Sequence, residues 1–227
     1  GASIAGGRGN DMITALGGGN TYAFNAGDGR DVIADASLQA GGYGSAGAST
    51  AGFGAGISLA DVSLSASAGA LVLKVANTDG SVADSISLLG FDASNAAAAL
   101  PIGALQFAAE GNVALSALLS NGFDFIGTDG AESLSGTNLQ DRFYGLGGDD
   151  TLSGGQGADI YHWSRGDGLD VVSDTGTSVA DLDTLDVSST LAIDQVAFVR
   201  GGNDLEIRTL DGLEMVRVAN HFGGPGL

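Results

Sequence analysis

The chain contains no cysteine, so no disulfide bond can hold its fold together. Aromatic residues make up only 6% of its 227 residues, so alanine, valine, leucine and isoleucine must supply most of the core. It has 8 basic residues and 27 acidic ones, which gives a formal net charge of −19. This charge is repelled by nucleic-acid phosphates and by anionic membrane surfaces, which argues against both partners. A multivalent cation is the partner that so many carboxylates favour.

Long apolar runs and a leader segment are also missing. The longest apolar run, residues 96–105, contains Pro101 and Gly103 and is too short to span a bilayer, so we expect no membrane insertion. The chain begins Gly1-Ala2-Ser3 without a charged and then apolar leader, as a processed protein or a fragment would. Hydrophobic residues nevertheless reach 44%, which distinguishes the chain from a disordered one.

Many of the 40 glycines and the acidic residues belong to a nine-residue repeat. Residues 127–162 divide into four consecutive nines: GTDGAESLS, GTNLQDRFY, GLGGDDTLS and GGQGADIYH. Each nine has glycine first, an acidic residue sixth and an apolar or aromatic residue eighth. Residues 6–14 (GGRGNDMIT) have the same form with Asp11 sixth, and the next nine, ALGGGNTYA, keeps Asn20 and Tyr22 in register.

Each nine predicts a turn followed by a short strand. Glycines in the first half permit positive φ and a tight turn with inward carbonyls, and the three residues after the acid form a strand whose middle side chain faces the core. Two nines make one coil, so residues 18 apart stack: Glu132 over Asp150, and Asp141 over Asp159. Stacked coils lie about 4.8 Å apart. Carboxylates at such a distance repel by about 1 kcal/mol in water and several times more where partly buried.

A cation between the coils would remove this repulsion. Ca²⁺ fits because it takes carboxylate and carbonyl oxygens, whereas Mg²⁺ sheds water reluctantly and zinc prefers His or Cys. We expect about three to five ions, one between each stacked pair of loops. The candidate ligands in the repeats are the carboxylates and neighbouring turn residues Asp11, Asp129, Glu132, Asp141, Gly145, Gly147, Asp149, Asp150, Gly154, Gln156 and Asp159.

The nines resemble the RTX (repeats-in-toxin) family, whose nonapeptide GGxGxDxUx is a Ca²⁺-binding β-helix repeat. GGRGNDMIT and GGQGADIYH follow that pattern closely, whereas GTDGAESLS and GTNLQDRFY have threonine second, and GTDGAESLS has glutamate sixth. Residues 24–35 (FNAGDGRDVIAD) and 163–174 (WSRGDGLDVVSD) are similar to the segment that closes RTX rolls. This resemblance implies terminal calcium ligands at Asp28, Asp31, Asp167 and Asp170.

A similar stretch of expected strands follows each closing segment, at residues 56–91 and 189–222. Both stretches alternate apolar residues, and each has a hairpin signal in its middle, at Asp79-Gly80 and Asp211-Gly212. They resemble the β-hairpin segment found after RTX repeats. Such a segment would cap the exposed strand edges of a roll.

The chain therefore contains the same plan twice, and the predicted fold is all-β: a parallel β-roll (β-helix or solenoid) with calcium-binding turns. Two tandem units are expected, residues 1–123 with a short roll and 124–227 with a longer one, each capped by β-hairpins. Residues 41–56, rich in Gly, Ala and Ser, are expected to form a flexible loop. Residues 92–101 favour a short helix or a loop, and residues 112–120 one or two helical turns.

Signals for catalysis are weak. LSGGQ at residues 152–156 matches the signature of ABC transporter ATPases, but the chain has no GxxxxGK[ST] phosphate loop. His162 and His221 have no visible partners for a general base or a zinc site, and a solvated or capping role suits His162, at an outward ninth position. The spacing of the paired carboxylates is explained by calcium rather than by glycoside hydrolysis. We expect no catalytic residues and no enzyme activity.

Two functions remain open. The first is a calcium-binding module of a secreted bacterial surface or assembly protein, of the adhesin, surface-layer or filament type, that folds on Ca²⁺ outside the cell. Its partners would be calcium and, by self-association or at a cell surface, other proteins. The second is the C-terminal folding and secretion module of a toxin or hydrolase. The RTX resemblance implies type I export through an uncleaved C-terminal signal, and hence a secreted, extracellular location.

Overall fold

The computed structural model describes residues 1–35, 49–76, 82–98, 100–176, 178 and 180–223. The chain is mostly β-structure and divides into two compact units, Gly1–Phe123 (unit 1) and Asp124–Leu227 (unit 2). In the described part of the chain, no helix is long and apolar enough to cross a membrane.

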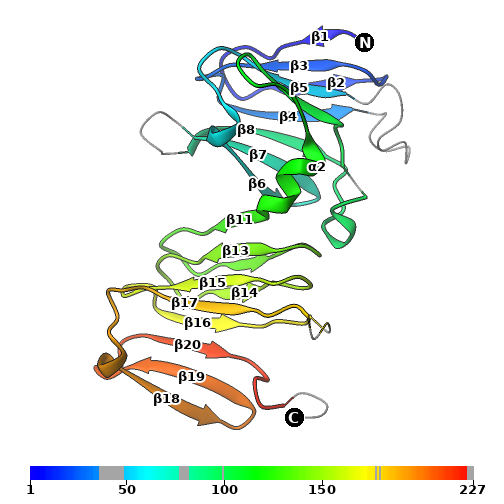
Figure 1. Cartoon of the computed structure of the whole chain (residues 1–227). Helices are drawn as coiled ribbons and strands as arrows, with labels where there is room; N and C mark the ends of the chain where they lie inside the picture. Colours follow the sequence, from blue (N-terminus) through cyan, green and yellow to red (C-terminus); the bar gives the residue numbers. More distant parts are fainter. Residues whose placement is uncertain (36–48, 77–81, 99, 177, 179, 224–227) are drawn as a thin grey trace. The chain divides into compact units, whose positions relative to one another are not determined.

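Unit 1 contains two sheets of mainly parallel strands (Figure 1). The first sheet contains four parallel strands in the order β1 (Ser3–Ile4), β3 (Thr21–Phe24), β5 (Thr50–Phe53) and β9 (Ala104–Phe107). The antiparallel strand β10 (Gly111–Ala114) follows β9 at the edge of this sheet. The second sheet contains the parallel strands β2 (Met12–Ala15), β4 (Arg30–Asp35) and β8 (Val82–Leu89). It continues through two antiparallel pairings, from β8 to β7 (Ala70–Ala76) and from β7 to β6 (Val62–Ser67). A short helix, α2 (Leu115–Leu118), follows β10.

Columns of stacked side chains form the core of unit 1. Tyr22 pairs in register with Ala51, which in turn pairs with Leu105, and these three residues are 0–1% exposed. The Phe53 ring stacks on Phe107 at 5.0 Å between centroids and meets Phe24 edge-on. The composition predicted a mostly aliphatic core. The few aromatic rings are nevertheless aligned from strand to strand inside it.

Unit 2 has the same arrangement (Figure 1). In one sheet the neighbouring strands are β11 (Phe123–Ile126), which begins at the last residue of unit 1, β13 (Asp141–Tyr144), β15 (Ile160–Trp163) and β17 (Thr184–Val187). In the other the strands are β12 (Ser133–Ser135), β14 (Thr151–Ser153), β16 (Leu169–Val172), β20 (Met215–Val218), β19 (Asp204–Thr209) and β18 (Val196–Gly201). The last two are antiparallel to their neighbours, and the others are parallel.

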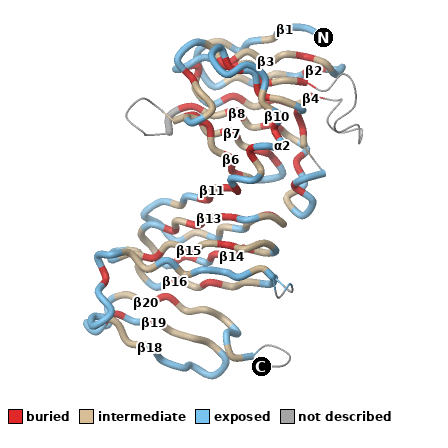
Figure 2. Tube along the Cα trace, viewed as in Figure 1, coloured by how far each residue is buried: buried red, intermediate tan, exposed pale blue. Residues whose placement is uncertain are grey.

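The stacking of residues 18 apart is confirmed in the repeats. Leu134 pairs with Leu152, and Phe143 pairs with Tyr161. Leu152, Phe143 and Tyr161 occupy the eighth position of their nines and are 0–2% exposed, as expected for the inward residue of each strand. The rings of Phe143 and Tyr161 stack at 5.2 Å. Figure 2 shows buried positions recurring along the strands in this way.

Some details differ from the sequence-based expectations. Residues 50–53 of the expected flexible loop form β5, because Ala51 and Phe53 alternate inward and fill the next layer of the core; residues 36–48 lie outside the described part. The parallel stack of unit 1 is therefore longer than the short roll expected. Residues 93–95 are a 3₁₀ turn, and residues 112–120 contain the end of β10 as well as α2 and a 3₁₀ turn.

The two expected hairpin turns have different outcomes. The Asp211-Gly212 turn joins β19 to β20, with the Gly212 N–H donating to the Thr209 carbonyl (2.9 Å). The Asp79-Gly80 turn lies outside the described residues. In both units the final strand of this segment, β8 or β20, pairs in parallel with a strand of the coil, β4 or β16.

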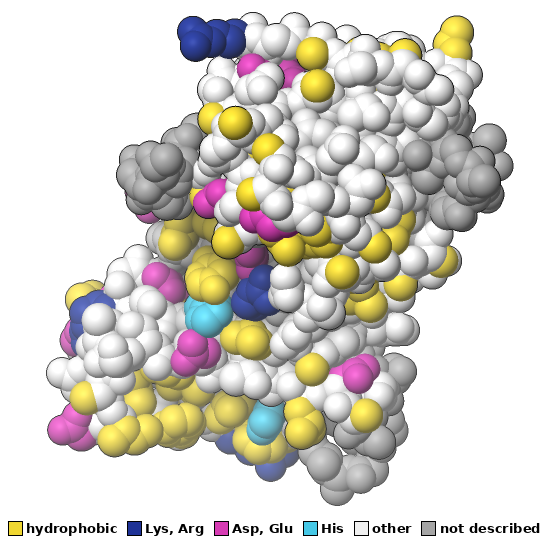
Figure 3. Space-filling view, turned by 45° about the horizontal axis from the view of Figure 1, so that its top comes forward, with side chains coloured by type: hydrophobic (Ala, Val, Ile, Leu, Met, Phe, Trp, Pro, Cys, Tyr) yellow, Lys and Arg dark blue, Asp and Glu magenta, His cyan; other side chains and the backbone are white. Residues whose placement is uncertain are grey.

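Basic side chains are few on the face drawn in Figure 3, in keeping with the net charge of −19. The described ion pairs are mostly at the surface, for example Arg165 with Asp211 at 3.1 Å. Exposed pairs of this kind contribute about 0–1 kcal/mol each. The acidic excess is therefore not neutralised by the chain's own cations.

Candidate metal sites in the turns

The acidic residue of each turn is tied to the turn one coil earlier. In every case a carboxylate Oδ1 accepts the backbone N–H of the preceding acid in its column. The pairs, donor first, are Asp11 to Asp31 (3.0 Å), Glu132 to Asp150 (2.8 Å), Asp141 to Asp159 (2.9 Å), Asp150 to Asp170 (3.0 Å) and Asp159 to Asp183 (3.0 Å). The predicted stacking of Glu132 over Asp150 and Asp141 over Asp159 is therefore present.

The second oxygen of several of these carboxylates is buried and unsatisfied. Asp11, Asp150 and Asp159 each have an Oδ2 with no hydrogen-bond partner among the described residues. Asp141 differs, because both of its oxygens receive hydrogen bonds from Thr137. A buried charged oxygen without a partner is strongly destabilising unless a cation meets it. The chemistry of these donors, hard anionic oxygens beside backbone carbonyls, fits Ca²⁺.

The first glycine of each nine makes room for the carboxylate of the same nine. A Cβ at Gly145 would lie 2.4 Å from Asp150 Oδ2, and one at Gly154 would lie 2.0 Å from Asp159 Oδ2. Neither glycine has positive φ, so lack of a side chain, rather than turn conformation, explains them. The glycine at the fourth position of this nine follows the expected turn chemistry, because Gly148 has φ 120°.

Burial raises the pKa of Asp141, Asp159 and Asp170 to about 7 each. Hydrogen bonds from backbone N–H groups, and for Asp141 from Thr137, oppose this effect. At Asp159 and Asp170, nearby aspartates raise the pKa further. Desolvation therefore dominates, and the fully ionised turns are unfavourable without a counter-ion.

These raised pKa values predict that protonation of the aspartates partly replaces calcium in stabilising the folded chain. An unfolded aspartate has a pKa of about 3.9, so between about pH 4 and pH 7 the folded chain binds more protons than the unfolded one. Stability of the metal-free chain must then fall as pH rises through this window. We expect more β-structure at about pH 5.5 than at about pH 7.5 in far-UV circular dichroism of metal-free protein. Equal or greater β-content at the higher pH would contradict this, and saturating calcium should abolish the difference.

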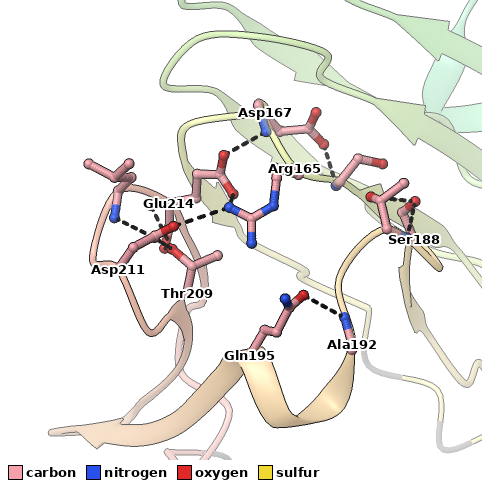
Figure 4. A network of polar contacts seen from close by, with 12 residues as sticks. Arg165, Asp167, Ser188, Ala192, Gln195, Thr209, Asp211 and Glu214 are labelled. Carbon is pink, nitrogen blue, oxygen red and sulfur yellow. Dashed lines mark hydrogen bonds and ion pairs between the residues drawn. The ribbon is translucent and has the colours of Figure 1, made fainter.

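The turns that follow the repeats hold acids that the resemblance implied and acids that sequence reasoning missed. Asp167 Oδ2 accepts the Ser164 N–H (2.6 Å), and Asp28 Oδ2 accepts the Asn25 N–H in the equivalent turn (2.8 Å). The missed acids lie opposite these turns. Glu214 Oε1 accepts the Gly166 N–H (2.7 Å; Figure 4), while Asp84 Oδ2 accepts the equivalent Gly27 N–H (2.6 Å). The sequence feature that could have revealed these acids is their place near the start of the last strand of each hairpin segment. Glu214 directly precedes β20, and Asp84 is the third residue of β8.

Sequence reasoning also missed a cluster of three acids in unit 2. Carboxylate oxygens of Asp159, Asp174 and Asp183 lie within 4.8 Å of one another. Asp159 belongs to the last nine, whereas Asp174 follows β16 and Asp183 directly precedes β17. An acid immediately before a strand is the same signal that the nines carry, but the loop between β16 and β17 removes the nine-residue spacing.

The other residues named in the sequence analysis have the following surroundings. Glu132 accepts the N–H and hydroxyl of Thr128, which lower the pKa of Glu132. Asp149 Oδ1 accepts the Leu169 N–H of the next coil (3.1 Å). Asp129 and Gln156 are exposed, and Gly147 lies beside Asp129. His162, expected to be solvated or capping, stacks on Tyr144 and pairs with Asp186 (2.9 Å).

Comparison with known proteins identifies the repeats. Residues 126–161 match the family model of the RTX calcium-binding nonapeptide repeat, in four copies. The chain has no match among curated proteins. Among solved structures it is similar to the extracellular lipase LipA from Serratia marcescens, at 16% identity and a TM-score of 0.31, over 92% of this chain. The chain spans 36% of the length of that lipase.

Proposed function

Because residues 126–161 are RTX calcium-binding nonapeptide repeats, we propose that the chain is a calcium-dependent module of a secreted protein. It folds when it meets calcium outside the cell. Each unit is a β-roll whose turns hold the ions and whose antiparallel strands protect one end of the stack. The chain acts by binding and folding rather than by catalysis.

The observation that carries this proposal is the column of tied acids with unsatisfied buried oxygens. Asp150 is 1% exposed and lies between the coils of Glu132 and Asp170, yet its Oδ2 has no partner in the described part of the chain. Repulsion in such a column opposes folding, and the glycine-rich turns lose much conformational entropy on folding. A ligand that binds only the folded chain reverses the balance by mass action.

Secretion follows from this dependence. Cytosolic calcium is too scarce to fill the turns, so the chain stays unfolded there and is suited to passage through an export channel. Millimolar calcium outside the cell then drives folding. The absence of cysteine agrees with a fold that uses metal ions, not disulfides, as its stabilising device.

The parent protein is proposed to be a surface or assembly protein, since two tandem units without a recognised catalytic motif fit such a role. A C-terminal module of a toxin or hydrolase is the alternative. The intact mass of the native secreted protein separates the two. A mass near 22.3 kDa, or one accounted for by further repeat units, supports the first, and an added catalytic domain supports the second.

Substitution of one acid in each unit tests where calcium binds. Asp150→Ala is expected to lower calcium affinity at least about tenfold, because it removes a carboxylate with acids stacked on both sides. Asp11→Ala is expected to have a smaller effect, because β2 is the edge strand of its sheet and, among the described residues, Asp31 is the one acid stacked on Asp11. Isothermal titration calorimetry with Ca²⁺ measures both. Equal losses in the two variants would contradict the assignment.

A further inference from the structure

The acid cluster of unit 2 has a positional counterpart in unit 1. In each unit a buried tyrosine, Tyr161 or Tyr22, is the second residue of its strand. Its hydroxyl donates to an acid of the other sheet, either Asp174, which follows β16, or Asp35, the last residue of β4. The residue directly before the tyrosine strand is Asp159 in unit 2 and Asn20 in unit 1. The third position, directly before the next strand of the same sheet, is Asp183 in unit 2 and Ser49 in unit 1.

We call Tyr161, Asp159, Asp174 and Asp183 the corner of unit 2, and Tyr22, Asn20, Asp35 and Ser49 the corner of unit 1. The hydrogen bonds of the two corners match residue by residue. The N–H of Asp159 donates to Asp183 Oδ1 (3.0 Å), and the N–H of Asn20 donates to Ser49 Oγ (3.2 Å). Asp159 Oδ1 accepts the N–H of Asp141, and Asn20 Oδ1 accepts the N–H of Ala2 (3.0 Å). The backbone of the two corners is therefore held in the same way, and the difference lies in charge.

In unit 2 the corner carries three carboxylates, and the hydrogen bonds that they accept among the described residues come from neutral donors, such as the Gly176 N–H to Asp174 Oδ1 (2.7 Å). Tyr161 has a single proton, which goes to Asp174 Oδ2 (3.0 Å), and its oxygen accepts the Gly154 N–H (2.9 Å). Asp159 is 0% exposed, and its Oδ2 has no partner in the described structure. A Cβ on Gly154 would contact both that Oδ2 and the Tyr161 oxygen, so the unsatisfied oxygen lies beside the Tyr161–Asp174 pair.

In unit 1 the same corner is complete without a cation. Asp35, 1% exposed, receives hydrogen bonds from the Tyr22 hydroxyl, from Ser49 Oγ (2.9 Å) and from Asn20 Nδ2 (3.5 Å). Two of these donors stand where unit 2 has carboxylates. A single buried carboxylate with three donors is a satisfied group.

We propose that Asp159, Asp174 and Asp183 bind one Ca²⁺ just beyond the repeat tract, and that Asn20, Asp35 and Ser49 are the cation-free form of the same corner. This inference rests on the proposed function and assigns two ligands, Asp174 and Asp183, outside the matched residues 126–161. Three anionic oxygens from three segments of the chain suit a cation of 6–8 oxygen ligands, with backbone carbonyls and water completing its shell. Calcium in this corner would hold Asp174 and Asp183 together, whereas in unit 1 the equivalent residues Asp35 and Ser49 are joined by a hydrogen bond.

The test exchanges the two corners in the full chain and counts ions. Asp183→Ser, alone and with Asp159→Asn, places the unit 1 side chains in unit 2 and is expected to lower the calcium stoichiometry. Asp183→Ser alone should remove one ion, since it lies outside the repeats. The reverse variant, Asn20→Asp with Ser49→Asp, is expected to add one ion. Asp186→Ser, on the strand β17 that Asp183 directly precedes, removes one exposed acid and should leave the stoichiometry unchanged.

Equilibrium dialysis with Ca²⁺ measures the stoichiometry, and circular dichroism at saturating calcium checks the fold. An unchanged ion count in Asp183→Ser overturns the inference, and so does an unchanged count in the unit 1 double variant. If Asp183→Ser does not fold, the unit 1 variant decides alone. Wild-type protein that binds no calcium at all would instead contradict the proposed function, so the two failures are distinguishable.

Discussion

Stripping calcium from the chain at neutral pH is expected to abolish the β-structure of unit 2, with most of it regained when Ca²⁺ is restored. Stacked carboxylates about 4.8 Å apart repel by about 1 kcal/mol in water and by several times more where buried. Unit 2 has two such columns, which include Asp150 with Asp170 and Asp159 with Asp183. Domain stability is only about 5–15 kcal/mol in total, so the summed repulsion is enough to remove it.

Unit 1 is expected to depend less on calcium. Its corner at Asp35 is satisfied by hydrogen bonds, and its rings Phe53 and Phe107 are stacked and buried. Its remaining acids at the turns, Asp11, Asp28 and Asp31, still repel one another. We therefore expect slower amide exchange in β3, β5 and β9 than in β13 and β15 once calcium is removed.

Far-UV circular dichroism of metal-stripped protein titrated with Ca²⁺, and hydrogen exchange read by mass spectrometry, test this prediction. Mg²⁺ at the same concentrations is the control, because it keeps its water and prefers octahedral geometry. A β-sheet spectrum that is indifferent to calcium would mean that the repeats are structural only. Equal loss of protection in both units would contradict the difference in dependence.

The strands and turns of the repeats could be predicted because each nine carries its own instructions. Glycine, acid and apolar residue recur at fixed places, so the stacking of Phe143 on Tyr161 followed from a spacing of 18. Beyond residue 162 the spacing changes to 20 for Asp150 with Asp170 and 24 for Asp159 with Asp183, because the loops are longer. Register then depends on which apolar residues pack, which no local pattern shows.

Residues whose role depends on a fold-wide contact were the ones missed. The roles of Asp174 and Ser49 depend on contacts that only the fold creates, since Asp174 accepts from the Tyr161 hydroxyl and Ser49 donates to Asp35. The strand at residues 50–53 was missed because alanine and glycine within it are also typical of loops, and only burial of Ala51 and Phe53 distinguishes it. Charge and repeat spacing thus reveal the ion-binding turns, while the hydrogen-bonded corner of unit 1 becomes visible only in the structure.

Gly148→Ala is expected to be among the most destabilising single substitutions in the turns, at about 3 kcal/mol or more. Gly148 has φ 120°, which L-residues rarely adopt, and a Cβ there would lie 2.5 Å from the Gly130 carbonyl oxygen and 2.6 Å from its carbon. Those atoms are backbone of the adjacent coil and cannot rotate away. The coils would have to separate, which would lengthen the bonds that tie Glu132 to Asp150 and Asp150 to Asp170 and so weaken calcium binding as well.

Two matched glycines separate the causes of this effect. Gly147 has ordinary φ, and a Cβ on it would find its nearest neighbour at 3.5 Å, so Gly147→Ala should change stability by no more than about 1 kcal/mol. Gly166 has φ 99° but open space around it, so Gly166→Ala isolates the conformational cost, about 1–2 kcal/mol. Urea unfolding at saturating calcium gives the three values. If Gly148→Ala costs no more than Gly166→Ala, the coils can part without penalty and close stacking is not what requires glycine at this position.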